Sequence, residues 1–138
     1  MAEDVEPRAQ DRTILIIDDD EGVVDVLEAI VRKEGFKCEK AFDGEEGVER
    51  ILKRQPDLLI LDLMLPRYGG FEILRQLQQK ETKTIPVIVI TGRYTDQTTA
   101  EMLRQESNVI EFLTKPLQPQ MLAMCLHRVL KTKPHGMG

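Results

Sequence analysis

Tryptophan is absent from this chain, and aromatic residues make up only 4% of its 138 residues. No uninterrupted apolar run approaches the roughly 20 residues that a membrane-spanning helix requires. The chain has no excess of basic residues: it contains 19 Lys and Arg and 24 Asp and Glu, which gives a net charge of −5. Nucleic acids are bound by basic faces and aromatic platforms. We therefore expect no membrane segment and no direct nucleic-acid partner.

Cysteine is also scarce: Cys38 and Cys125 are far apart and form no CxxC pair. Such cysteines are typical of small core residues in a reducing compartment. The acidic N-terminus lacks the apolar segment of a signal peptide, so we expect a cytoplasmic protein. The length and the 41% hydrophobic content predict one folded domain over residues 12–132, with flexible tails at 1–11 and 133–138.

Short apolar runs alternate with amphipathic segments along the chain. Four runs rich in Ile, Leu and Val are typical of strands buried on both faces of a parallel sheet: 14–17, 58–61, 87–90 and 109–113. The alternating segment 36–42 predicts an edge strand. Helical patterns lie between the strands, at 21–34, 44–54, 70–80, 96–106 and 118–131. This alternation predicts an α/β fold with a doubly wound parallel sheet.

Polar residues follow four of the predicted strands at the point where each strand ends. They are Asp18, Asp19 and Asp20 after the first, Asp62 after the third, Thr91 and Gly92 after the fourth, and Lys115 after the fifth. The carboxyl ends of parallel strands share one edge of the sheet, where open α/β sheets bind ligands. Two carboxylates 4 Å apart repel by roughly 4 kcal/mol at an effective dielectric of 20. A hard divalent cation, Mg²⁺ or Mn²⁺, would relieve that repulsion.

Each of these residues also has an ordinary structural interpretation. Asp20 can cap the helix that follows it, and Asp62 can be a turn residue. Lys115 can be a solvated turn lysine, and Thr91 an ordinary β-branched strand residue. Only their joint placement at successive strand ends argues for a functional site.

The histidines and clustered methionines carry less information. We interpret His127 as a residue of a helix surface and His135 as part of a tail, since neither has a second metal-ligating residue at a suitable spacing. Met102, Met121 and Met124 are interpreted as core or groove packing.

The constellation resembles the receiver domain of two-component response regulators. The resemblance covers residues 13–131 and rests on ILIIDDDE (14–21), DLLILDLMLP (57–66), PVIVITG (86–92) and FLTKPL (112–117). It implies a flavodoxin-like (βα)5 fold with strand order 2-1-3-4-5. It also implies a cis peptide bond between Lys115 and Pro116.

The resemblance assigns a role to each site residue. Asp62 would accept a phosphoryl group, and Thr91, the Gly92 N–H and Lys115 would contact its oxygens. The Mg²⁺ ligands would be Asp18, Asp19, Asp62 and the backbone carbonyl of Met64.

The resemblance further implies the partners. A sensor histidine kinase or a histidine phosphotransfer protein would donate the phosphoryl group. A downstream effector protein or domain would read a switched surface formed by the fourth helix, fifth strand and fifth helix. Such a protein is a monomer or a weak phosphorylation-dependent dimer. It is not an enzyme, since it catalyses only its own phosphorylation and slow dephosphorylation. The remaining length holds no output domain, which leaves a stand-alone regulator or a fragment of a longer chain.

Three positions depart from the common family pattern. Phe112 lacks the hydroxyl that an aromatic residue often carries there, so switching through that hydroxyl would be absent. Residues 67–70 form an unusual loop after Asp62. Asn108 replaces a common glycine, and we expect it to tolerate a left-handed turn.

Two enzymatic or cofactor-binding alternatives are disfavoured by the sequence. A phosphatase of the haloacid-dehalogenase type needs acidic ligands after its lysine, and residues 116–138 contain no Asp or Glu. A flavodoxin needs a neutral phosphate-binding loop, whereas the acidic run at 18–21 would repel a phosphate. A receiver-shaped module that is never phosphorylated remains an open alternative.

Overall fold

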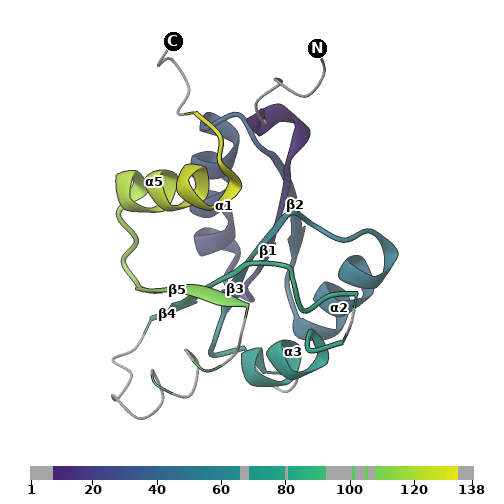
Figure 1. Cartoon of the computed structure of the whole chain (residues 1–138). Helices are drawn as coiled ribbons and strands as arrows, with labels where there is room; N and C mark the ends of the chain where they lie inside the picture. Colours follow the sequence, from purple (N-terminus) through teal and green to yellow (C-terminus); the bar gives the residue numbers. More distant parts are fainter. Residues whose placement is uncertain are drawn as a thin grey trace, which may run out of the picture.

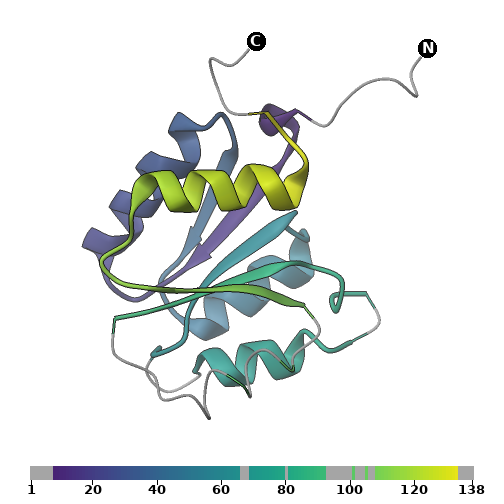
Figure 2. The same ribbon diagram turned by 60° about the vertical axis from the view of Figure 1, so that its left-hand side comes forward.

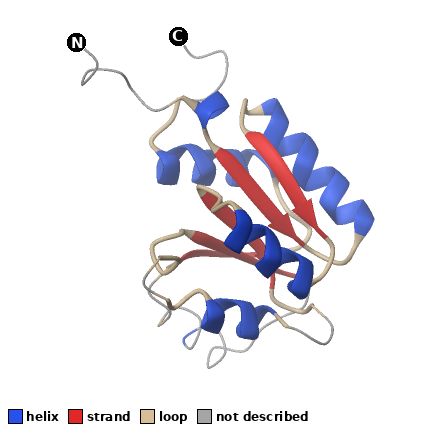
Figure 3. Ribbon diagram, turned by 90° about the vertical axis from the view of Figure 1, so that its right-hand side faces the viewer, coloured by secondary structure: helices blue, strands red, loops and turns tan. Residues whose placement is uncertain are grey.

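The computed structural model describes residues 8–65, 69–79, 81–92, 101, 105 and 108–133. Five parallel strands form one sheet in the order β2-β1-β3-β4-β5, with helices on both faces (Figures 1 and 3). This confirms the predicted doubly wound fold and its strand order. The strands are β1 (Thr13–Ile17), β2 (Lys37–Ala41), β3 (Leu58–Asp62), β4 (Val87–Thr91) and β5 (Val109–Thr114). The helices are η2 (Ala9–Asp11), α1 (Glu21–Lys33), α2 (Gly44–Lys53), α3 (Gly70–Gln76) and α5 (Pro119–Leu130).

The continuous apolar runs are explained by cores on both faces of the sheet. Ile14 and Ile16 of β1 pack into the cluster that contains Leu27 of α1 and Leu126 of α5. The alternate residues of β1, such as Ile17, pack into the cluster that includes residues of α2 and α3. Figure 2 shows the same division, with α1 and α5 on one face of the sheet and α2 and α3 on the other. Because β3 and β4 are also buried throughout, neither face tolerates a polar residue before the strand ends.

The ends of the helices differ from prediction in an informative way. Asp20 accepts hydrogen bonds from the N–H groups of Gly22 and Val23, at 2.9 and 3.2 Å, so its predicted role as the cap of α1 is confirmed. The third helix ends at Gln76 rather than at residue 80. There the buried hydroxyl of Thr82 donates to the carbonyl of Leu77 over 2.8 Å and stabilises a turn instead of a further helical turn. The helix predicted at 96–106 lies largely outside the described residues.

Part of the predicted N-terminal tail is ordered. Residues 9–11 form a 3-10 helix, and Ala9 packs against the core on the α1 side of the sheet. The carbonyl of Arg12 accepts a hydrogen bond of 2.9 Å from the N–H of Lys37, which ties this segment to β2. The prediction of a tail over residues 1–11 is therefore wrong for its last residues, which contact β2 through pairings that lie far away in the sequence.

His127 is buried, so its interpretation as a surface residue is wrong. Its ring nitrogens lie 2.6 Å from Thr132 Oγ1 and 2.8 Å from Glu34 Oε1, and its ring centroid is 5.1 Å from that of Phe36. With both nitrogens hydrogen-bonded, a polar ring is tolerated in this interior position. It joins the C-terminal ends of α5 and α1.

Two of the three methionines lie at the surface. The side chains of Met121 and Met124 are 55% and 71% exposed and line a groove between β5 and α5, so they are not core residues. Met102 is outside the described residues. Asn108 is buried, and its side chain donates to the carbonyl of Ile85 and accepts from Gln78 Nε2. These hydrogen bonds give a reason for a polar residue at this position. No helix within the described segments is long and apolar enough to cross a membrane.

We predict that His127→Ala lowers the free energy of unfolding by about 2 kcal/mol, since it leaves a cavity and removes the partner of buried polar groups. Urea denaturation followed by far-UV circular dichroism measures the change. Met124→Ala is the matched control on the same helix and should have little effect, because that side chain is 71% exposed. Equal losses in the two variants would contradict the interpretation.

Candidate functional site

The ends of four strands bring the predicted site residues to one edge of the sheet. In the strand register Ile17 of β1 is paired with Leu61 of β3, so Asp18 and Asp62 are level as the next residues. Thr91 ends β4, paired with Thr114 of β5, and Lys115 follows. The N–H of Lys115 donates a hydrogen bond of 2.7 Å to the carbonyl of Thr91. The convergence expected from the sequence is therefore present in the fold.

Three carboxylates form a cluster at this edge. One oxygen each from Asp18, Asp19 and Asp62 lies within 4.8 Å of the others. Asp18 is fully buried and Asp62 is 4% exposed, whereas Asp19 is exposed. Burial strengthens the repulsion between these groups, because little water separates their charges.

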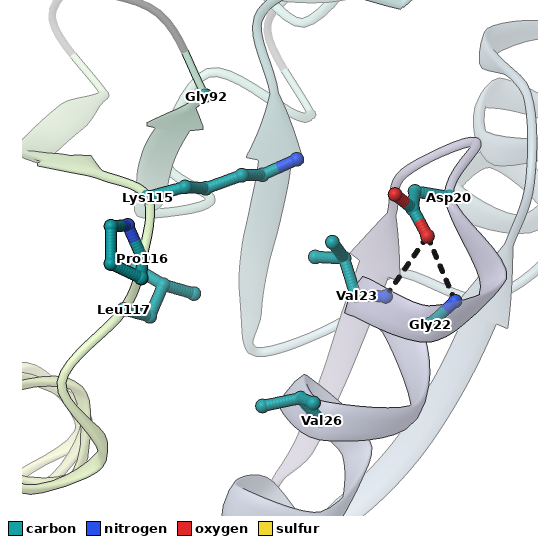
Figure 4. Close-up of a pocket in the computed structure, with 8 residues that line it drawn as sticks. All are labelled: Asp20, Gly22, Val23, Val26, Gly92, Lys115, Pro116 and Leu117. Carbon is teal, nitrogen blue, oxygen red and sulfur yellow. Dashed lines mark hydrogen bonds between the residues drawn. The ribbon is translucent and has the colours of Figure 1, made fainter.

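Lys115 supplies a positive charge to the cluster. Its ammonium nitrogen lies 3.0 Å from Asp18 Oδ2 and 3.8 Å from Asp62 Oδ2, and its side chain is 21% exposed. Figure 4 shows this side chain extending from the β5 end of the sheet, with its ammonium group away from Pro116. Within the part of the chain that the structure describes, one cation lies beside three carboxylates, which leaves an excess of negative charge.

Backbone hydrogen bonds hold one oxygen of each buried carboxylate. Asp18 Oδ1 accepts from the N–H of Asp20, and Asp62 Oδ1 accepts from the N–H of Met64, both over 3.0 Å. The other oxygen, Oδ2, faces Lys115 in both residues. The turn interpretation of Asp62 is thus compatible with a functional one, since each role uses a different oxygen.

The donor set fits a divalent cation. Asp18 Oδ2 is buried and accepts no well-aligned hydrogen bond from the described residues, although the Lys115 ammonium is close to it in an ion pair. Buried carboxylates are costly unless cations offset their charge, and one ammonium cannot offset the charge of three carboxylates. Several carboxylate oxygens at a site that is open on the Asp19 side suit Mg²⁺, which retains some of its water ligands.

The environment raises the pKa of Asp62 above its ordinary value of 3.8. Burial is the largest cause, and the negative charge of Asp18 acts in the same direction. The Met64 N–H and the Lys115 ammonium oppose the shift without cancelling it. In the metal-free protein, ionised Asp62 is therefore held at a cost in stability.

Three further predicted residues lie around the cluster. Thr91 is fully buried at the end of β4, and Gly92 follows it at an exposed position. Met64 stands in the turn after Asp62, with a side chain that is 52% exposed. These positions are compatible with the roles that the resemblance implies.

A cavity of about 700 Å³ opens beside Lys115 (Figure 4). Its walls come from the start of α1 and from the segment after β5: Asp20, Gly22, Val23, Val26, Gly92, Lys115, Pro116 and Leu117. This apolar wall was not predicted from the sequence. Val26 was a usable signal, because it is an apolar residue outside the stripe that α1 buries against the core. The Lys115–Pro116 peptide bond is cis, as the resemblance implied.

A sequence model of the response regulator receiver domain family matches residues 14–127. The chain belongs to this family. It is 32% identical over 109 residues to the alkaline phosphatase synthesis transcriptional regulatory protein PhoP of Bacillus subtilis, with 79% of this chain and 44% of PhoP covered. This receiver domain chain thus spans less than half the length of that relative.

Solved structures of receiver domains share the fold. The receiver domain of a signal transduction histidine kinase from Syntrophus aciditrophicus is 30% identical, with a TM-score of 0.78 and coverage of 87% of this chain and 90% of that one. A response regulator receiver domain protein from Methanospirillum hungatei JF-1 is 27% identical, with a TM-score of 0.77 and coverage of 87% and 94%. Receiver domains are signalling domains of two-component systems, and the acidic cluster described above is compatible with Mg²⁺ binding.

We predict that Asp62→Asn raises the urea midpoint of the metal-free protein at pH 7. A carboxyl group with a raised pKa in the folded state contributes stability below its unfolded pKa, and this contribution is lost as the pH rises through the folded value. The asparagine variant does not suffer that loss. Its advantage should therefore shrink as the pH falls through the folded pKa of Asp62.

Urea midpoints in a chelator at neutral and mildly acidic pH test this expectation. Asp25→Asn, at an exposed position of α1, makes the same change in charge away from the cluster and is the control. An Asp62→Asn advantage that is absent at neutral pH, or that grows on acidification, would contradict the assigned cause.

Proposed function

We propose that Asp62 accepts a phosphoryl group from the phosphohistidine of a sensor histidine kinase or a histidine phosphotransfer protein, in a reaction that depends on Mg²⁺. The observation that carries this proposal is the geometry of Asp62 at the end of β3. Its carboxylate joins Asp18 and Asp19 in one cluster, with the ammonium of Lys115 at 3.8 Å. A nucleophilic carboxylate needs such surroundings, because it must approach a phosphoryl group that is itself negative.

Asp62 Oδ2 is the better nucleophile of the two carboxylate oxygens. Oδ1 accepts a hydrogen bond from the Met64 N–H, whereas Oδ2 faces the ammonium of Lys115. In the proposed step a bond forms between Oδ2 and phosphorus while the bond from phosphorus to the donor imidazole breaks. The electron pair of the broken bond stays on the imidazole nitrogen, and the product is an acyl phosphate.

Lys115 and Thr91 would receive the oxygens of the transferred group. The hydrogen bond from the Lys115 N–H to the Thr91 carbonyl holds the backbones of these two residues next to each other. The ammonium would pair with a phosphoryl oxygen, and the Thr91 hydroxyl and the Gly92 N–H would donate to others. Phosphoryl transfer depends mainly on such positioning and charge stabilisation.

Asp18, Asp19, Asp62 and the backbone carbonyl of Met64 would hold the Mg²⁺ ion. When bound, Mg²⁺ neutralises negative charge on the carboxylates and on the phosphoryl oxygens. The crowding of three carboxylates supports this assignment, since Lys115, 3.0 Å from Asp18 Oδ2, offsets only part of their negative charge.

The cavity beside Lys115 offers a route for the donor. Its lining combines apolar residues, including Val26 and Leu117, with Lys115. A phosphohistidine side chain that enters there could place its anion beside Lys115.

For the output we propose the surface formed by the fourth helix, β5 and α5, which an effector protein or domain would bind. The fourth helix lies largely outside the described residues. We further propose that the protein is cytoplasmic and is a monomer or a weak phosphorylation-dependent dimer.

We predict that acetyl phosphate with Mg²⁺ adds one phosphoryl group to the wild-type chain and none to Asp62→Asn. Intact-mass spectrometry measures the addition directly. Asp25→Asn is the matched control and should be labelled like the wild type, because it removes an exposed carboxylate of α1. Labelling that persists in Asp62→Asn would assign the acceptor elsewhere, and an unlabelled wild type would favour a binding module that is never phosphorylated.

We predict that Asp19→Asn stabilises the metal-free protein and weakens its binding of Mg²⁺. The substitution removes one of three mutually repelling carboxylates and also one oxygen ligand. Urea midpoints measured with a chelator and over a series of Mg²⁺ concentrations separate the two effects, since a ligand of the folded state stabilises by an amount that grows with the logarithm of its concentration over its Kd. Lower stability of this variant without metal would count against the repulsion.

A further inference from the structure

Gly70 occupies a position that has no room for a side chain. An ideal Cβ at this residue would lie 2.9 Å from Leu63 Cα and 3.0 Å from the carbonyl oxygens of both Asp62 and Leu63. All three contacts are with backbone atoms, so rotation of a side chain cannot relieve them. Gly70 does not have a positive φ, and the need for glycine here is therefore one of space and not of conformation.

The backbone that a Cβ would strike cannot move away freely. The N–H of Leu63 donates a hydrogen bond of 2.9 Å to the carbonyl of Ile90 in β4. On the other side of the same turn, the N–H of Met64 donates to Asp62 Oδ1 over 3.0 Å. A displacement of the Asp62–Leu63 peptide would strain both bonds and would turn the carboxylate relative to Asp18.

The helix that begins at Gly70 cannot retreat freely either. Ile73 and Leu74 of α3 are 0% and 1% exposed in the core beneath the sheet. Moving the start of α3 outward would pull these side chains from close packing. The clash therefore has to be shared with the segment that carries Asp62.

We propose that Gly70 is a positioning residue for Asp62: the absence of a side chain at the start of α3 lets the helix press on the Asp62–Leu63 backbone and fixes the direction of the acceptor carboxylate. This inference rests on the proposed function of Asp62. The start of α3 would thus position the backbone of Asp62, although the acidic cluster of Asp18, Asp19 and Asp62 contains no side chain from this helix.

Two other glycines provide matched controls for an alanine substitution. At Gly69, the preceding residue, the nearest atom of a described residue to a new Cβ is the Leu65 carbonyl oxygen at 3.6 Å, an ordinary contact. At Gly47 of α2, a new Cβ would clash with the side chain of Ile17, which lies in the core. Gly69→Ala thus tests the local change in the loop, and Gly47→Ala tests a packing defect that does not involve the Asp62 backbone.

The experiment compares the wild type with Gly70→Ala, Gly69→Ala and Gly47→Ala in three measurements. Urea denaturation gives the folded fraction. Titration with Mg²⁺ alone, followed by the NMR shift of the Met64 amide, reports the cluster without any phosphoryl donor. Labelling by acetyl phosphate at saturating Mg²⁺, followed by intact mass, gives the rate per folded molecule.

For Gly70→Ala we expect the Mg²⁺ midpoint to rise about tenfold and the labelling rate to fall by about tenfold to a hundredfold, as a displaced reacting group requires. Gly69→Ala should match the wild type in all three measurements. Gly47→Ala should lose stability but keep the wild-type Mg²⁺ midpoint and labelling rate per folded molecule. If Gly70→Ala is poorly folded, the measurements are repeated in trimethylamine N-oxide, which stabilises folded states.

Several outcomes would overturn the inference. These are wild-type behaviour of Gly70→Ala, an equal defect in Gly69→Ala, and a defect of Gly70→Ala that disappears when corrected for the folded fraction. A Gly70→Ala chain that stays unfolded in the osmolyte would show a general structural role instead. Absence of labelling in the wild type would refute the acceptor role of Asp62, while the Mg²⁺ titration would still test whether Gly70 orients its carboxylate.

Discussion

The repulsion between the buried carboxylates of Asp18 and Asp62 is the interaction on which the rest of the site depends. Asp62 ends β3 and Asp18 follows β1, two adjacent strands of the sheet, and both side chains are buried. Lys115 contacts both of them but compensates only part of their charge. The packing of the apolar cores must therefore offset this repulsion in the folded protein. A cation that binds to the cluster reduces the repulsion and so stabilises the folded state.

Backbone geometry decides how that charge is presented. In Asp18 and in Asp62 one carboxylate oxygen is satisfied by an N–H two residues further along the chain, which leaves Oδ2 directed toward Lys115. The end of β3 is braced by the hydrogen bond from Leu63 to Ile90 of β4 and by the close approach of α3 at Gly70. These contacts fix the backbone that carries Asp62, as the proposed reaction requires of a group that must be positioned.

Features that arise from local sequence patterns could be predicted, whereas features that arise from contacts between distant parts of the chain could not. The strand runs and the residues that follow them, such as Asp62 and Lys115, could be predicted because parallel strands end at a common edge wherever they pair. The burial of His127 could not, since its partner Glu34 lies on another helix and 93 residues away. The same holds for Ala9, whose contacts depend on the path of β2, and for the cavity beside Val26, which exists only once α1 and the segment after β5 are adjacent.

The asymmetry of exposure across the site bears on the direction of the proposed reaction. Asp18 and Asp62 are buried, whereas the side chain of Lys115 is 21% exposed and borders the cavity. An anionic phosphoryl group in the cavity could therefore contact the Lys115 ammonium, whereas the buried carboxylates of Asp18 and Asp62 are less accessible from solvent. Phe112 packs against the core on the α2 and α3 side and has no hydroxyl. If the proposed phosphorylation moves Thr91, the side chain of Phe112 could therefore contribute only through packing.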